Sequence, residues 1–241
     1  MAGCESRDAG NGAGNHGVPA AARLNQPGHV QIVSLVTSTG ILIRNTQPRD
    51  IAGVVALQRE CFPAPFPEEL LWQAEHIARH LEIFPEGQWV AEHEGQIVAS
   101  CTNLLLFEEH WQAHLDWEST VGGHFLRAHT PGGTTLYGVD LSVAPASRGQ
   151  GIGRSLYQAR FDFVRAHALS RYGTAVRMPD YQSQAQGQTP QAYAEAVAAG
   201  TLTDRTLTPL LRMGTEFLGV IENHMDDEES GHAAAILEWR P

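Results

Sequence analysis

The spacing of apolar positions changes repeatedly along the chain after residue 40, and these changes predict alternating strands and helices. A short apolar strand over 41–44 is followed by 51–60, where apolar residues recur at helical spacing. The proline-rich stretch 62–67 ends that helix, because each proline removes a backbone donor and restricts the residue before it. A second helix is expected over 68–82.

The remaining elements follow from the same reading. An antiparallel hairpin is expected around Glu94 and Gly95, because extended apolar runs flank this turn. Later strands and helices are separated by Gly, Pro and polar residues. The predicted hairpin arms are 88–93 and 96–107, the later strands are 134–143, 174–177, 217–221 and 233–239, and the later helices are 155–168 and 204–213.

The organisation is that of one domain with additions. Residues 1–38 are rich in Gly, Ala, Asn and Ser and are predicted to be a disordered tail, in which 30–36 can form an extra strand. A single domain is expected over 39–241. Two insertions interrupt it, at about 108–133 and at 178–203, and the second contains an amphipathic helix over 189–199.

Composition narrows the choice of partners and compartment. The formal net charge of −11 argues against nucleic acid or an anionic membrane as the main partner. No apolar run is long enough to span a bilayer, and no secretory signal pattern is visible. Cys4, Cys61 and Cys101 show no paired spacing, which favours a reduced, cytoplasmic setting.

The most specific feature is the Gly-rich stretch 147–154, which lies between the apolar strand and the next helix. A turn that opens a helix directs several backbone N–H groups to one point, at the positive end of the helix dipole, and so predicts a phosphate site. A P-loop is excluded because no Gly-Lys pair occurs here. A dinucleotide fingerprint is excluded because position 154 is Arg where a third Gly is needed.

The pattern that does fit is V-x-P-x-x-R-G-x-G-I-G, which begins at Val143 and ends at Gly153. It resembles motif A of the GNAT superfamily of acyl-CoA N-acyltransferases. This resemblance implies an α/β (α+β) fold with a mixed, mostly antiparallel central sheet. Helices would cover both faces, and the sheet would be splayed at the strand that binds acyl-CoA.

The resemblance also assigns the acyl-CoA site residue by residue. The pantetheine arm would pair with the main chain of the strand, and the diphosphate would lie on the turn and the helix start. The strand residues are Leu141, Ser142 and Val143, and those of the turn and helix are Arg148, Gly149, Gln150, Gly151, Ile152, Gly153, Arg154 and Ser155.

Catalytic residues are less clearly indicated. Asp140 lies within an apolar strand, where alternation places it with Ser142 and opposite Val139 and Leu141, and a carboxylate there is either a general base or a structural hydrogen-bonding group. Many relatives have a tyrosine as general acid where this chain has Leu210. Tyr181 is the first alternative for the acid. His224 is the second, and its place in the chain suggests a surface turn.

The function implied is acetyl transfer from acetyl-CoA, as co-substrate, to a primary amine of a small molecule. The alternatives are acetylation of a protein N-terminus or lysine, and a non-catalytic acyl-CoA sensor. The pairs His76–His80 and His110–His114 lack the H-E-x-x-H motif and are read as solvated helix faces, so no metal is expected. Homodimers are frequent in such families, but no interface is visible in the sequence.

Overall fold

The computed structural model describes residues 35–36, 40–64 and 66–241. Most of the predicted tail, 1–38, lies outside these residues, and of the strand expected at its end only a two-residue strand, β1 (Leu35–Val36), is described. The described chain forms one eight-stranded sheet in the order β1-β2-β3-β4-β5-β6-β8-β7.

The first half of the chain gives four strands and two long helices. These elements are β1, β2 (Leu42–Asn45), α1 (Ile51–Cys61), α2 (Ala74–Ile83), β3 (Trp89–His93) and β4 (Gln96–Leu106). The helix predicted over 68–82 is divided, because Leu71 is extended and separates a 3-10 turn at Glu68–Leu70 from α2. Each of the other elements lies within a few residues of its predicted place.

The second half of the chain adds the two insertions and the remaining strands. In order, its elements are α3 (Glu108–Gln112), α4 (Trp117–Val121), β5 (Thr135–Val143), α5 (Ile152–Ala166), β6 (Arg171–Arg177), α6 (Tyr181–Gln184), α7 (Pro190–Ala198), α8 (Leu207–Arg212), β7 (Glu216–Ile221) and β8 (Ala234–Trp239).

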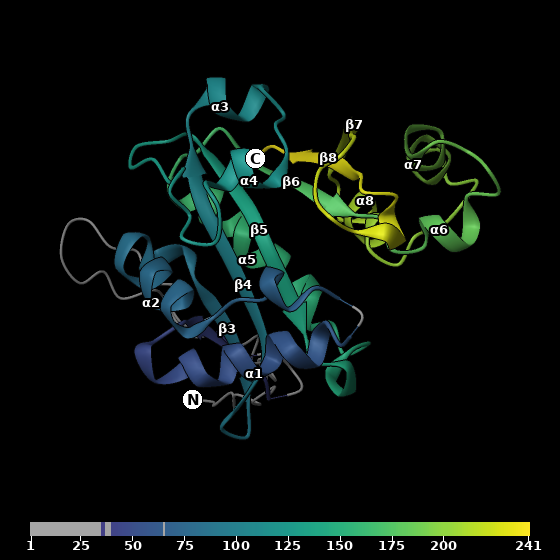
Figure 1. Ribbon diagram of the computed structural model, residues 1–241. Coiled ribbons are helices and arrows are strands. Elements are labelled where there is room, and N and C mark those ends of the chain that lie inside the picture. The colour runs from purple at the N-terminus through teal and green to yellow at the C-terminus, as the bar shows by residue number, and fades with distance from the viewer. Residues whose placement is uncertain (1–34, 37–39, 65) are drawn as a thin grey trace, which may run out of the picture.

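The sheet is mixed and mostly antiparallel, as the resemblance implies, because only the β5–β6 pair is parallel. Helices α1 and α2 cover one face, and α5 covers the other (Figure 1). Strands β6, β7 and β8 lie with helices α6, α7 and α8 to one side of β3, β4 and β5 (Figure 1). None of the helices among the described residues has the length and apolarity needed to cross a bilayer.

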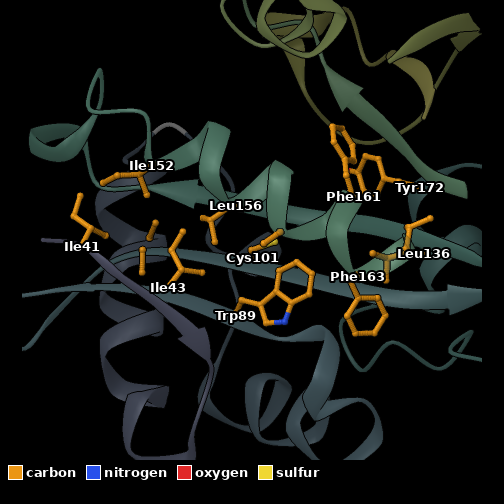
Figure 2. Close-up of a cluster of buried hydrophobic side chains, with 14 of the residues drawn as sticks. Ile41, Ile43, Trp89, Cys101, Leu136, Ile152, Leu156, Phe161, Phe163 and Tyr172 are labelled. Carbon is orange, nitrogen blue, oxygen red and sulfur yellow. The ribbon is translucent and has the colours of Figure 1, made fainter. Parts of the chain in front are cut away.

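Apolar side chains fill both layers between helix and sheet. On the α5 side, Ile152 and Leu156 point toward the strands that carry Ile43, Trp89 and Cys101 (Figure 2). On the other side, side chains of α1 and α2 pack with the first insertion and with β4 and β5. The second insertion forms its own cluster with α8, β7 and β8.

A β-bulge interrupts the pairing of β4 with β5. Thr102 is opposite Asp140 while the next residue, Asn103, is opposite Gly138, so Val139 is the extra residue of β5. Leu136 and Leu141, five positions apart, therefore contact the same core on the α5 side. Val139 packs on the α1 side, the side of Asp140, and the expectation that these two lie on opposite faces is wrong.

Candidate functional site

Strands β5 and β6 part immediately beyond this bulge. Their parallel pairing ends at Gly138 and Thr174, whereas β6 continues to Arg177 paired with β8. On the other side of β5, the Ala144 amide donates to the Val98 carbonyl at 2.9 Å. Because antiparallel bonds alternate along a strand, the N–H and C=O groups of Leu141 and Val143 face away from β4, toward the side that β6 has left.

The turn after β5 depends on glycine at two positions. Gly149 has φ +77° and Gly151 has φ +80°, which is the left-handed region that other residues enter only with strain. A Cβ atom at either position would meet nothing within 4 Å, so the space over the turn is open. Gly153 differs, since it is helical and a Cβ there would make ordinary contacts with Leu141 and Val143.

Helix α5 begins at Ile152, earlier than the predicted start at residue 155. Its first internal bond runs from the Ser155 amide to the Gly151 carbonyl at 3.0 Å. The amides of Ile152, Gly153 and Arg154 therefore have no carbonyl partner within the helix. Among the residues predicted to hold a diphosphate, the Arg148 amide is likewise engaged, since it donates to the Pro145 carbonyl at 3.3 Å.

Two arginines add positive charge at this helix start. Both Arg148 and Arg154 are exposed, and the Nε of Arg148 donates to the Val143 carbonyl at 3.1 Å. Cations at a helix N-terminus oppose the dipole. An anion on the amides of the turn would reverse that interaction, so the arrangement is suited to a phosphate group.

Asp140 follows the bulge residue Val139 in β5, and its side chain points toward α1. The buried side chain of Gln58 donates through Nε2 to its Oδ2 at 3.1 Å and to the Ser142 hydroxyl at 3.0 Å. The Ser142 hydroxyl lies 3.2 Å from the same carboxylate oxygen. Burial raises the pKa of Asp140 to about 6, against the opposing effect of these hydrogen bonds. Such a carboxylate is ionised at neutral pH and still basic enough to accept a proton.

Three neighbours of Asp140 escaped the reading of the sequence. Gln58 continues the buried stripe of α1 that includes Val54, and a polar residue at an apolar position was the available signal. Trp72 is a further neighbour, and its indole lowers the pKa of Asp140. The Cys61 thiol lies near Asp140 and Arg148, and burial raises its pKa to about 11. No local pattern marks Trp72 or Cys61.

The two alternatives for the general acid are placed differently from one another. Tyr181 lies on α6, where its hydroxyl donates to the Gln188 carbonyl at 2.8 Å and its ring packs against Tyr193. His224 is buried, which corrects the expected surface turn, and burial lowers its pKa to about 4. Leu210, at the position of the family tyrosine, is buried among apolar residues. A role of Tyr181 as acid stays a prediction.

The histidines of α2 do not form a solvated face. His80 is buried against the edge of Trp72, its Nε2 lies 2.7 Å from the His124 carbonyl, and burial lowers its pKa to about 4. His76 lies beside the ring of His124, with 4.9 Å between centroids. Across the described residues, no group of three or more His, Cys, Asp or Glu side chains has the geometry of a metal site.

Comparison with known proteins identifies the family of this chain. The sequence profile of the acetyltransferase (GNAT) family matches residues 51–186. The uncharacterized N-acetyltransferase YkwB of Bacillus subtilis is 36% identical over 200 residues, which cover 83% of this chain and 88% of YkwB. The probable hydrolase YhcX of the same species is 35% identical over 201 residues, but these cover only 38% of YhcX.

Solved structures share the fold. The loading GNATL domain of CurA from Lyngbya majuscula superposes with a TM-score of 0.72 at 16% identity, covering 83% of this chain and 97% of that domain. The GphF GNAT-like decarboxylase, in complex with isobutyryl-CoA, has a TM-score of 0.67 at 26% identity, covering 82% and 98%. The profile match and the relationship to YkwB establish that this chain belongs to the GNAT acetyltransferase family.

Proposed function

We propose that the protein is an N-acetyltransferase that moves the acetyl group of acetyl-CoA directly to a primary amine of a small molecule. The observation that carries this proposal is the continuous main-chain surface from Leu141 to Arg154. Its strand amides lie beside the parting of β5 and β6, and its helix amides lack partners within α5. Together they suit an extended pantetheine arm followed by a diphosphate.

In the proposed reaction the substrate amine attacks the thioester carbonyl. An amide of the Leu141–Val143 segment would donate to the developing oxyanion, as in other acyl-transfer sites. Asp140 would accept the proton of the incoming ammonium, since its raised pKa of about 6 suits a general base near neutral pH. The thioester C–S bond then breaks, and either Tyr181 or solvent returns a proton to the leaving thiolate in place of the absent tyrosine.

The first insertion supports a small acceptor over a protein tail. Trp111 of α3 donates to Glu238 of β8 at 3.3 Å, and the Trp117 amide of α4 donates to the His224 carbonyl at 2.9 Å. The insertion is thereby fastened over the α1 side of the sheet, the side to which Asp140 points. Trp117 of this insertion packs against Trp72, a neighbour of Asp140, with 6.1 Å between ring centroids. A wall beside the candidate base favours a compact amine over an extended peptide.

A second candidate function is decarboxylation of an acyl-CoA that carries a carboxyl group β to the thioester. It is favoured by the likeness to the GphF GNAT-like decarboxylase and by Leu210. Decarboxylation releases carbon dioxide without expelling the CoA thiolate, so it needs no acid at that position. The ionisable Asp140 opposes it, because a second carboxylate would be repelled there.

One assay separates these functions. Purified protein is mixed with acetyl-CoA and a panel of polyamines, amino acids, aminoglycosides and short peptides, and thiol release is recorded beside CoA binding by calorimetry. We expect release with one class of free amine. Carbon dioxide without thiol from a malonyl-type CoA thioester, whose carboxyl group is on the carbon next to the thioester carbonyl, would establish the decarboxylase instead. Tight CoA binding with neither product would indicate a sensor.

A further inference from the structure

A buried arginine lies behind the bulge of β5. Arg160 belongs to the face of α5 that also carries Leu156 and Val164, and only 1% of its surface is exposed. Helical spacing makes this an apolar position, and a buried cation is costly unless its charge and its donors are satisfied. No carboxylate forms an ion pair with Arg160 in the described part of the chain. Its position therefore calls for an explanation other than an ion pair.

The donors of Arg160 are directed instead at the two strands that form the bulge. Its Nη2 donates to the main-chain oxygen of Asp140 at 2.6 Å and to that of Thr102 at 3.2 Å. Its Nε donates to the Asn103 side chain at 2.7 Å, and its Nη1 donates to the Tyr172 hydroxyl at 3.1 Å. Every nitrogen of the guanidinium is thus hydrogen-bonded within this cluster.

The backbone at the bulge is shaped to admit this group. A Cβ atom on Gly138 would lie 3.0 Å from Cζ of Arg160 and 2.3 Å from the Tyr172 hydroxyl. Glycine is therefore required here for close approach and not for a turn. The guanidinium lies where β5 pairs for the last time with β6.

The carbonyl of Asp140 and the amide of Leu141 belong to one peptide unit. In a trans peptide these two groups point in opposite directions. A charged donor on the carbonyl side draws electron density from the peptide and makes the N–H on the other side a stronger donor. The Leu141 N–H, like that of Val143, faces away from β4, toward the side on which β6 no longer pairs with β5.

We propose that Arg160 is a positioning residue that acts through the Asp140–Leu141 peptide. It strengthens the Leu141 amide as the donor to the thioester carbonyl oxygen and holds that amide at the bulge. The proposal rests on the acyl-CoA binding of the proposed function, because the carbonyl oxygen it acts on is that of the bound acyl group. Arg160 itself touches neither thioester nor amine.

The test uses the infrared carbonyl band of bound acetyl-CoA labelled with carbon-13 at the carbonyl, recorded without any amine. We expect the wild-type protein to lower the frequency of this band, and Arg160→Met to lose at least about half of that shift. With an amine present, kcat should fall about 10- to 100-fold while the dissociation constant of CoA stays within about threefold. Arg165→Met on the exposed side of the same helix should change none of these quantities.

Arg160→Lys keeps the positive charge but lacks the several N–H donors of the guanidinium. It is the second test variant if Arg160→Met does not fold. We expect it to recover part of the infrared shift and part of kcat. A folded Met or Lys variant with the full wild-type shift would overturn the proposal. The infrared measurement also separates the proposed acetyl transfer from the proposed role of Arg160. If the band shift depends on Arg160 but no amine is acetylated, the proposal of acetyl transfer is wrong and the role of Arg160 stands. Failure to bind any acyl-CoA would remove both.

Discussion

The amide Nε2 of Gln58 lies 3.1 Å from Oδ2 of Asp140, and this contact joins α1 to the bulged strand at the candidate base. Hydrogen bonds to an ionised carboxylate favour that form and lower its pKa. Gln58→Met keeps the volume and removes the donor. We expect the acid limb of the kcat/KM profile to move to higher pH by about half a unit to one unit. Arg59→Met, on the exposed side of α1, is the control, and an unmoved limb in Gln58→Met would contradict the assignment.

The pH dependence of the wild-type reaction follows from Asp140 itself. With a pKa of about 6, the carboxylate is the base above that pH and is protonated below it. We expect kcat/KM to fall about tenfold per unit below about pH 6. Asp140→Asn should lower kcat by at least about 100-fold and leave CoA affinity unchanged, and turnover that survives this change would remove the role as base.

Although Asp140→Asn should lower kcat, it should raise the stability of the folded protein. The pKa of Asp140 in the folded state lies above the unfolded value of 3.8, so the folded state bears a cost above about pH 6, where both states are ionised. A shift of about two units corresponds to at most about 3 kcal/mol. Asp140→Asn should therefore raise the free energy of unfolding at about pH 8, and the gain should disappear at about pH 4, below which both states are protonated. Urea denaturation at these two pH values measures it.

Gly151 and Gly200 form a matched pair for the phosphate turn. Both have positive φ, +80° and +75°, and both have open space around a Cβ atom. Alanine at either position should cost about 1 kcal/mol of stability through backbone strain. Only Gly151→Ala should weaken CoA binding, and Gly151→Asp should abolish it through charge repulsion as well. Calorimetry with CoA checks this, and undiminished affinity in Gly151→Asp would remove the phosphate site.

Gly138 should tolerate no side chain beside Tyr172. Gly138→Ala places a methyl group 2.3 Å from the Tyr172 hydroxyl, and overpacking of this kind costs about 1–3 kcal/mol. Tyr172→Phe removes the clashing oxygen, so the double variant should regain part of the loss. A double-mutant cycle in urea shows whether the two positions are coupled, and simple additivity would mean that they are not.

A structural feature could be predicted from the sequence where it depends on residues that are adjacent in the chain. The strand before Val143, the turn and the following helix were predictable, because glycine spacing and an apolar run encode them in adjacent residues. The bulge at Val139 was not, since it depends on Thr102 and on Arg160, which are distant in the chain. Helix α5 starts earlier than predicted because Gly151 is its N-cap, a position that glycine patterns do not separate from a loop.

Arg160 was overlooked for a related reason. Arginine on a helix is usually solvated, and only the period shared with Leu156 and Val164 places it inward. Burial of His80 and His224 escaped prediction likewise, because the first insertion covers α2 and the loop after β7 through contacts that no local pattern records. The backbone of the strand, turn and helix that the resemblance assigns to acyl-CoA was therefore predictable, and the surroundings of Asp140 were not.

The contact between Trp111 and Glu238 spans 127 positions of the chain. Glu238 also pairs with Arg171 at 2.8 Å, so the insertion, β6 and β8 meet at one carboxylate. Contacts that close so long a loop form late in folding, because the chain loses the entropy of loop closure before the contact stabilises it. The turn that would hold the diphosphate is built from neighbours and can mature early. During refolding the protein should therefore regain CoA binding before the first insertion is fixed beside the proposed acceptor site.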